Sequence, residues 1–370
     1  MKRLIGFVKT NIVMLIALTL ATVTMIIVPP DEEYLGYFDF KTLTCLFTVL
    51  AVVSALRNVR FFYTVAEKIV KRFGNARLAV IALVYITFIG SMLIANDMAL
   101  ITFLPLGYFV LISTHKEKYM CVTFILQNIA ANLGGMLTPF GNPQNLYLYS
   151  KFNIPDGEFM LIMLPAFLLA IAMITVSAII FVKPEPLELS GAERKLPRVR
   201  VAIYLILFAF AILCVFRFIP YQLALIVIPV FILIMDRRAL LNVDYGLLLT
   251  FVFFFIFSGN MARIDLVRNL FSALLDKSTL VVSALSCQLI SNVPTAILLS
   301  QFTENYKELL LGVNIGGCGT IISSLASLIT FRSYTEHNHG KAKHYLLVFS
   351  AFNFTFLAVL LAFQLLILAL

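Results

Sequence analysis

The stretch NLGGMLTPFGNPQN, Asn132–Asn145, interrupts a long apolar run with residues that a membrane-spanning helix normally avoids. It contains adjacent glycines, two prolines and several amide or hydroxyl side chains. Proline removes a helical hydrogen bond, and a bilayer offers no water to satisfy the backbone groups that are freed. Irregular backbone is tolerated at membrane depth only inside protein or beside a cavity. The stretch therefore predicts a broken transmembrane helix next to a polar site.

The composition indicates that the whole chain lies in a membrane. Of its 370 residues, 61% are hydrophobic and 13% are charged, and the mean hydropathy is +0.98. These values exclude an ordinary soluble domain. The first apolar run, Leu4–Pro29, is too long for the apolar region of a signal peptide, so we interpret it as a retained span. We expect an all-α polytopic protein of the plasma membrane, in a bacterial cell.

Basic residues predict the orientation in the membrane. A cytoplasmic N-terminus places the basic loops on the cytoplasmic side and the C-terminus outside. Only seven of the 28 Lys and Arg then fall outside: Lys41, Lys151, Arg217, Arg263, Arg268, Lys277 and Lys307. The net charge of +9 thus reflects short loops beside spans, and no nucleic-acid partner is expected.

This orientation corresponds to nine crossings. They are residues 4–28, 42–56, 119–148, 157–182, 199–217, 219–235, 245–258, 306–334 and 344–369. Residues 60–73 and 262–275 have apolar positions at helical spacing with charged residues between them, which is typical of helices that lie in the membrane interface.

The opening stretch has a second copy in the chain. Asn132-Leu-Gly-Gly recurs as Asn314-Ile-Gly-Gly, and small or polar residues recur six, nine, ten and thirteen positions after each asparagine. These pairs are Thr138 with Thr320, Gly141 with Ser323, Asn142 with Ser324, and Asn145 with Ser327. One glycine pair alone would indicate close helix packing, but repetition at equal offsets favours a site.

A polar dipeptide precedes the second copy within an apolar run, at Ser291-Asn292. The flanking limbs, 278–290 and 294–303, would reach only about 20 and 15 Å as helices, against a hydrocarbon core of about 30 Å. Neither limb can span the membrane. We therefore expect a re-entrant hairpin over residues 278–303 that enters from outside.

The equivalent dipeptide before the first copy is Asn96-Asp97. Its limbs, 78–94 and 98–113, are long enough to form two tight spans, and that alternative stays open. The analogy with the second copy favours a re-entrant hairpin over residues 78–113 that enters from the cytoplasm. The two hairpins then have opposite orientations, as in inverted-repeat transporters.

These features divide the chain into two inverted repeats and a linker. The first repeat, 1–182, would contain the hairpin 78–113 and the broken helix 119–148. The second, 199–370, would contain the hairpin 278–303 and the broken helix 306–334. Residues 183–198 are rich in proline and mixed charges, as expected of a cytoplasmic linker.

Two broken helices and two hairpin tips would bring several helix ends to the middle of the membrane. Helix amino ends carry free N–H groups and partial positive charge, which suit an anion, whereas carbonyl, amide and hydroxyl oxygens can hold a small cation. We expect these groups to form one pocket for an ion and a substrate. Because the pocket as predicted contains no buried Lys or Arg, helix ends and bound cations would balance a substrate's negative charge.

Four motifs carry a family resemblance: ND…ALIT.LP, N.GGMLTPFGNPQNLYLY, SNVP and N.GG..T..SSLAS. In this order, and over nearly the whole chain, they resemble the ion transporter superfamily. Within it the chain is similar to the divalent anion:sodium symporters and citrate transporters, and its Asn-Asp pair resembles that of arsenite permeases. The resemblance implies a homodimer in which a transport domain, formed by the hairpins and broken helices, moves like an elevator against a scaffold.

The resemblance also implies which residues bind the coupling ion and the substrate. Residues carried over by position to the ion and substrate site are Asn96, Asp97, Asn132, Thr138, Gly141, Asn142, Asn145, Ser291, Asn292, Asn314, Thr320, Ser323, Ser324 and Ser327. Sodium would lie among Asn96, Asn142, Asn145, Ser291, Asn292 and Ser327. No other cofactor is expected, and the coupling ion would be sodium or a proton.

Asp97 is the only charged residue between Arg77 and His115. An acid inside a membrane segment is a functional-site hypothesis, either as a proton carrier or as an ionised ligand of sodium. The structural alternative is an N-cap of the second hairpin limb. Cys318, inside the second broken helix, could contact a thiophilic substrate such as arsenite, although apolar surroundings usually leave a cysteine inert.

The sequence thus predicts a secondary active transporter, not an enzyme. Its substrate would be a small anion, with a di- or tricarboxylate such as citrate as the first candidate. Efflux of arsenite or another oxyanion is the alternative, and a passive anion channel is less favoured. No Walker A, GxSxG or HExxH pattern is present to support ATP-driven transport or hydrolase chemistry. For each of these functions, we expect membrane lipid to surround the chain.

Overall fold

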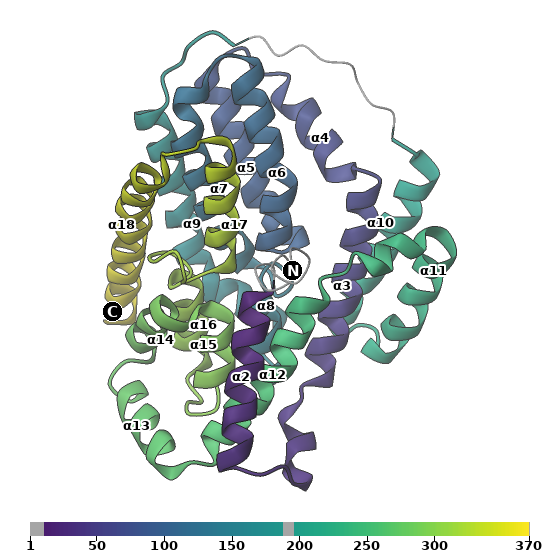
Figure 1. Ribbon diagram of the computed structural model, residues 1–370, viewed down its shortest axis with the longest axis vertical. Helices are drawn as coiled ribbons and strands as arrows, with labels where there is room; N and C mark the ends of the chain where they lie inside the picture. The colour runs from purple at the N-terminus through teal and green to yellow at the C-terminus, as the bar shows by residue number, and fades with distance from the viewer. Residues whose placement is uncertain (1–10, 188–195, 370) are drawn as a thin grey trace.

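The computed structural model describes residues 11–187 and 196–369, and its regular elements there are helices, apart from one isolated bridge between Asn75 and Pro186 (Figure 1). The first ten residues and residues 188–195 of the predicted linker lie outside the described part. The elements before the linker are α2 Ile12–Ile27, η1 Glu32–Tyr37, α3 Phe40–Asn58, α4 Phe61–Val70, α5 Ala76–Ile94, α6 Asn96–Ser113, η2 Glu117–Tyr119, α7 Met120–Gly134, η3 Gly135–Leu137, α8 Pro143–Lys151 and α9 Asp156–Phe181.

The second half of the chain is helical in the same way. Its elements are α10 Arg198–Val215, α11 Tyr221–Leu241, α12 Tyr245–Ala262, α13 Asp265–Leu275, α14 Thr279–Ile290, α15 Asn292–Leu299, α16 Tyr306–Ile315, α17 Leu325–His337 and α18 Ala342–Ala369.

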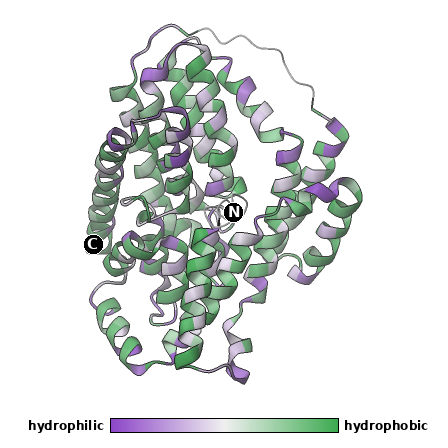
Figure 2. Ribbon diagram, viewed as in Figure 1, coloured by the Kyte–Doolittle hydropathy of each residue, from purple (hydrophilic) through white to green (hydrophobic). Residues whose placement is uncertain are grey.

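Eight helices of the described part are long and apolar enough to cross a membrane: α3, α5, α6, the α7 segment Glu117–Leu137, α9, α10, α12 and α18. Long helices such as α9 and α18 are hydrophobic over most of their length (Figure 2). The prediction of an all-helical polytopic membrane protein is therefore confirmed.

Three of the nine predicted crossings are not among these eight helices. The first, 4–28, is represented by the short helix α2, and its residues 4–10 lie outside the described part. Crossing 219–235 lies in α11, which continues past a kink at Asp236 into charged residues. Crossing 306–334 is divided between α16 and α17. Both α5 and α6 instead qualify as spans by length and composition, so the hairpin 78–113 stays a prediction.

Polar residues cap many of the helices at their amino ends. The side-chain Oδ1 of Asn75 accepts from the Leu78 N–H at 2.9 Å at the start of α5, and the hydroxyl of Ser278 accepts from the Val281 N–H at the start of α14. Such caps satisfy N–H groups that have no partner inside the helix. They fix where these helices begin in a chain whose apolar pattern is nearly continuous.

The two expected hairpin tips share one unusual backbone conformation. Ala95 has φ 65° and ψ 150°, and Ser291 has φ 72° and ψ 160°, a region that residues with a side chain rarely occupy. Each residue separates two packed helices, α5 from α6 and α14 from α15. The backbone thus pairs Ala95-Asn96 with Ser291-Asn292. The sequence alignment of Asn96-Asp97 with Ser291-Asn292 was wrong by one residue.

The helices pack in two groups (Figure 1). In one, α3 contacts α10 and α11. In the other, α5 packs against α6 and α7, α14 against α16, and α17 against α6 and α7. The helix pair α2 and α12 contacts the second group through α15. Helix α4, expected in the membrane interface, packs against α3, α5 and α6.

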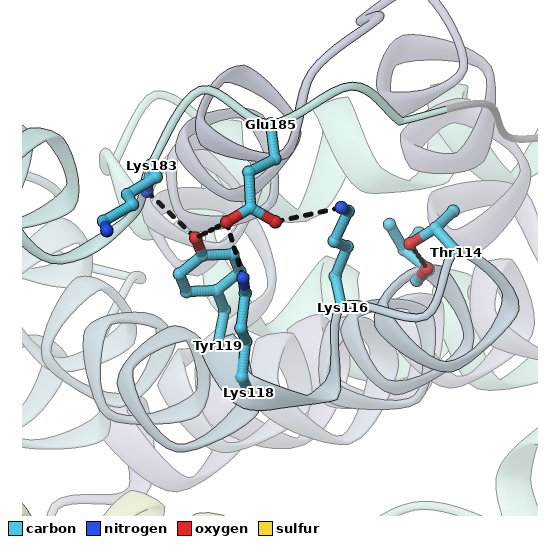
Figure 3. A network of polar contacts seen from close by, with 7 residues as sticks. Thr114, Lys116, Lys118, Tyr119, Lys183 and Glu185 are labelled. Carbon is cyan, nitrogen blue, oxygen red and sulfur yellow. Dashed lines mark hydrogen bonds and ion pairs between the residues drawn. The ribbon is translucent and has the colours of Figure 1, made fainter.

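Glu185, near the start of the predicted linker, is bonded to the rest of the protein (Figure 3). Glu185 accepts hydrogen bonds from Lys118 at 2.5 Å, Lys116 at 2.9 Å and the Tyr119 hydroxyl at 2.7 Å. Its backbone carbonyl accepts from the Ala76 N–H at 2.8 Å. These bonds attach the chain after α9 to the loops that begin α5 and α7.

Candidate functional site

The two broken helices resume with the same backbone conformation at equal distances from their asparagines. Helix α7 ends at Gly134, and α8 begins after Asn142, which has φ −134° and ψ 141°. Helix α16 ends at Ile315, and α17 begins after Ser324, which has φ −148° and ψ 142°. Asn142 and Ser324 each lie ten residues after the asparagines Asn132 and Asn314. The short sequence repeat therefore corresponds to a repeat in structure.

A threonine in each broken segment is bonded to the hairpin of its own half. Thr138 Oγ1 donates to the carbonyl of Met92 at 2.8 Å, and Thr320 Oγ1 donates to that of Gln288 at 3.0 Å. Met92 and Gln288 both lie three residues before the tip residues. These two hydroxyls therefore attach the broken helices to the hairpins, and this role accounts for their equal offsets.

Glycine in the repeat permits close approach of helices. A Cβ on Gly134 would overlap the carbonyl oxygen of Phe88, and one on Gly316 would lie 2.9 Å from the Ala284 Cα. Phe88 and Ala284 both lie seven residues before the hairpin tips. Gly141, predicted as a site residue, leaves room for the Gly135 carbonyl in the same way. The glycines thus serve the packing around the site.

Asn132 connects the two halves. Its Oδ1 accepts from the Ser324 hydroxyl at 2.8 Å and from Asn96 Nδ2 at 3.1 Å, and its Nδ2 donates to the Gly317 carbonyl at 3.4 Å. All three side chains are buried. One amide therefore joins the first hairpin tip to the second broken helix.

Asn314 forms the reciprocal connection. Its Oδ1 accepts from Asn142 Nδ2 at 3.1 Å and from Gln144 Nε2 at 3.4 Å, and its Nδ2 donates to Asn145 Oδ1 at 2.6 Å. Asn145 in turn donates to the backbone carbonyls of Gly135, Met136 and Thr138. The irregular backbone of the opening stretch is thereby held by one side chain.

The remaining predicted residues of the second half lie around its hairpin tip and at the start of α17. The Ser323 carbonyl accepts from the Asn292 N–H at 3.0 Å and from the Ser291 hydroxyl at 3.3 Å. Ser327 accepts from Asn128 Nδ2 at 3.3 Å, which again joins the two halves.

A cavity of about 800 Å³ lies against these residues. Five of the predicted site residues line it: Asn96, Asp97, Ser291, Asn292 and Ser324. The other nine lie in the network behind it or in the hairpin attachments. Its wall extends to Asn11, Asp244 and Glu336, residues that the predicted orientation places near the cytoplasm.

Four helices begin at the wall of this cavity. The first residues of α6, α8, α15 and α17 line it, namely Asn96, Pro143, Asn292 and Leu325. Helix amino ends carry partial positive charge and free N–H groups. Four helix amino ends therefore converge at this cavity, and their partial positive charges favour the binding of an anion.

The cavity also contains charged side chains. Arg332 of α17, an exposed residue that was not among the predicted site residues, lines it on the same helix face as Leu325 and Leu328. Three carboxylates, Asp97, Asp244 and Glu336, line it too.

Several buried acceptor oxygens have no hydrogen-bond partner among the described residues. Three are at the site: Asp97 Oδ1, Asn142 Oδ1 and Gln144 Oε1. A buried acceptor without a partner costs free energy, on the order of 1–3 kcal/mol. Such oxygens suit a small hard cation or a proton. Gln144 is a site candidate that the sequence reasoning missed, although it lies within the opening stretch.

Two more polar residues were missed. Gln288 donates to the carbonyls of Gly316 and Cys318 and accepts from the Thr320 N–H at 2.8 Å, so it orders the second break. Asn128 bonds to Ser327. Both are amides within apolar helices, a signal that could have identified them. Cys318 is fully buried and is not part of the cavity wall.

Comparison with known proteins identifies the family of the chain. The sequence pattern of the citrate transporter family, CitMHS, matches residues 3–306. An uncharacterized transporter of Methanocaldococcus jannaschii is 30% identical over 95% of this chain and 96% of its own.

Two further relatives are more distant. The inner membrane protein YbiR of Escherichia coli is 25% identical over 80% of each chain. The silicon efflux transporter LSI3 of Oryza sativa subsp. japonica is 29% identical over 38% of this chain and 29% of its own. The family match covers most of the chain, and the first relative spans nearly all of it. The chain is therefore an integral membrane transporter, not an enzyme, and it belongs to the citrate transporter family.

Proposed function

We propose that the protein is a secondary active transporter that couples a sodium or proton gradient to the movement of a small carboxylate anion, with citrate and other di- or tricarboxylates as the first candidates. The observation that carries this proposal is the convergence of four helix amino ends, those of α6, α8, α15 and α17, on one cavity of about 800 Å³. Helix amino ends stabilise bound carboxylates through free N–H groups and the helix dipole. Arg332 adds a guanidinium that can bind a carboxylate with two hydrogen bonds.

Coupling to a cation is supported by the acceptor oxygens at the site. Asp97 Oδ1, Asn142 Oδ1 and Gln144 Oε1 have no partner among the described residues. A bound cation would satisfy these oxygens and offset the substrate's charge. Asn96, Asn142, Asn145, Ser291, Asn292 and Ser327 remain the proposed sodium environment.

The packing of the helices indicates which parts of the protein would move during transport. Residues 1–182 and 199–370 would be inverted repeats, and their hairpins and broken helices would form one transport unit. The helices α3, α10 and α11 would form the scaffold and the interface of a homodimer. The protein would lie in the plasma membrane with its N-terminus in the cytoplasm, so the cavity would open to the cytoplasm.

A second candidate is efflux of a neutral or weakly charged oxyacid, such as arsenite. One observation favours it: Asp97, Asp244 and Glu336 outnumber the single Arg332 at the cavity wall. An acidic cavity disfavours a multiply charged anion unless cations accompany it. A partial relative is named a silicon efflux transporter.

Uptake into proteoliposomes separates these candidates. Purified protein is reconstituted, and accumulation of labelled citrate is measured under an imposed sodium gradient, a proton gradient or neither, with succinate and arsenite as competitors. Gradient-dependent accumulation of citrate, inhibited by succinate, supports the first proposal. Citrate equilibration without dependence on either gradient indicates a passive channel. No citrate uptake, combined with arsenite flux, indicates the oxyacid route.

A further inference from the structure

A second cavity lies beside the site and shares the α6 residues Ile101 and Pro105 with the first cavity. Its volume is about 380 Å³, and it is lined by Arg57, Arg60, Phe62, Tyr63, Ile101, Thr102 and Pro105. These residues come from the end of α3, the start of α4 and the middle of α6, and Figure 1 places α4 beside these two helices. The cavity therefore lies between the proposed scaffold and the first hairpin.

Two guanidinium groups face this cavity without an acidic partner. Arg57 donates to Met98 Sδ at 3.2 Å and to the Asn242 carbonyl at 3.5 Å, both uncharged acceptors. Neither Arg57 nor Arg60 forms an ion pair with a residue in the described ranges. Two adjacent positive charges without compensation favour an anion between them.

The surroundings combine charge with apolar surface. Arg57 lies in the last turn of the span α3, where the predicted orientation places the cytoplasmic edge of the membrane. Ile101, which lines the cavity, is 42% exposed although it lies within a candidate span. A ligand with an anionic head and an apolar tail fits such a site better than a soluble anion. Basic pockets between transmembrane helices on the cytoplasmic side commonly bind lipid headgroups.

We propose that this cavity binds the phosphate headgroup of an anionic phospholipid from the cytoplasmic leaflet, with Arg57 and Arg60 as its ligands. The headgroup would lie between α3 and α6, and the Arg57–Met98 contact would connect it to a residue three positions after the tip residue Ala95. The bound lipid would stabilise this arrangement of the hairpin against α3. The site is independent of the transported substrate, so failure of the citrate proposal leaves it untouched.

Thermal stability of the purified full chain in detergent tests this proposal. The probes are phosphatidylglycerol, phosphatidylcholine, and inorganic phosphate as the soluble source of the same group. We expect phosphatidylglycerol to raise the melting temperature in a saturable manner, and the other two probes to have no such effect. In Arg57→Gln/Arg60→Gln, the apparent affinity for phosphatidylglycerol should fall on the order of tenfold or more.

Matched variants control for a general effect of charge removal and for misfolding of the double variant. Arg237→Gln/Arg238→Gln removes the same charge from exposed residues near the same membrane edge and outside the cavity, and it should keep the lipid effect. Within residues 11–187 and 196–369, the Arg60 side chain has no ion pair that Arg60→Gln would break, so this variant tests binding even if the double variant folds poorly. Undiminished lipid stabilisation in Arg60→Gln and the double variant would overturn the proposal. Equal stabilisation by inorganic phosphate, lost in the double variant, would overturn the assignment to lipid.

Discussion

Ser324 Oγ donates a hydrogen bond of 2.8 Å to Oδ1 of Asn132, across 192 residues of sequence. The reciprocal contact joins Asn142 Nδ2 to Asn314 Oδ1 at 3.1 Å. In both, the cap position of one broken helix bonds to the asparagine before the break in the other half. The two breaks therefore stabilise each other, and neither half can form its irregular segment in the same way alone.

Asn132→Ala should destabilise the fold by about 1–3 kcal/mol, because it leaves the buried Asn96 amide and Ser324 hydroxyl without their shared acceptor. The measurement is the melting temperature in detergent. The matched control is Asn353→Ala, which removes an equally buried amide that bonds only within α18. An equal loss of stability in Asn132→Ala and Asn353→Ala would argue against a special role for the hydrogen bonds by which Asn132 joins the two halves.

Asn145→Ala and Asn292→Ala should each abolish gradient-driven transport while the protein remains inserted. Asn145 holds three backbone carbonyls of the first break, and Asn292 lies at the cavity wall on the second hairpin tip. Initial uptake rates in proteoliposomes, normalised to reconstituted protein, provide the measurement. Normal rates in both variants would remove the proposed pocket, and Asn353→Ala again serves as the control.

The sequence was sufficient to predict the breaks because their chemistry is local. Glycine, proline and amides in an apolar run have few explanations, and their repetition at equal offsets identified Asn132 with Asn314 and Thr138 with Thr320. Their partners could not be predicted as readily. The Thr138–Met92 bond involves a backbone carbonyl, which has no sequence signal. For the same reason, the sequence alignment of the two hairpin tips was shifted by one residue. The feature that the tips share is the backbone conformation of Ala95 and Ser291, not their side chains.

The cavity wall was harder still to predict. Arg332 and Asp244 belong to α17 and to the cap of α12, and only tertiary packing brings them to the hairpin tips. The contacts of Glu185 were hard to predict for a related reason. The predicted linker has the composition of a solvated segment, and the two lysines that Glu185 contacts come from a loop far away in the sequence.

Gly134→Ala should reduce stability by at least about 1–3 kcal/mol, since the added methyl group would overlap the Phe88 carbonyl and force α7 away from α5. Gly157→Ala is the control, because no atom lies within 4 Å of its added methyl group. Melting temperatures of the two variants should differ clearly. A Gly134→Ala protein as stable as Gly157→Ala would contradict the close packing.

Glu185 should make stability depend on pH in a defined window. Hydrogen bonds from Lys118, Lys116 and Tyr119 lower the pKa of Glu185 from its ordinary 4.5 to about 2 in the folded protein. Its contribution is therefore fully present above pH 4.5 and is lost as the pH falls from 4.5 toward 2. The melting temperature of wild type should exceed that of Glu185→Gln at pH 7, and the difference should shrink at pH 3. A constant difference would contradict this contribution.

Asp97→Asn separates the two roles of the buried acid. Asp97 is 8% exposed, lines the cavity, and has one carboxyl oxygen without a partner among the described residues. If Asp97 carries the coupled proton, the asparagine variant should lose its response to a pH gradient. If the carboxylate holds sodium, the variant should instead need more sodium for the same uptake rate, while its pH response stays as in wild type.

Asp244→Asn is the matched control, because Asp244 also lines the cavity but caps α12 through the Leu247 N–H at 2.9 Å. Its substitution should lower stability more than it alters coupling, since a neutral cap loses its favourable interaction with the helix dipole. Uptake is measured from pH 5.5 to 8 at several sodium concentrations for wild type and both variants. Profiles of Asp97→Asn that match wild type in both pH and sodium dependence would exclude Asp97 from coupling altogether and leave Asn142 and Gln144 as the oxygens to test.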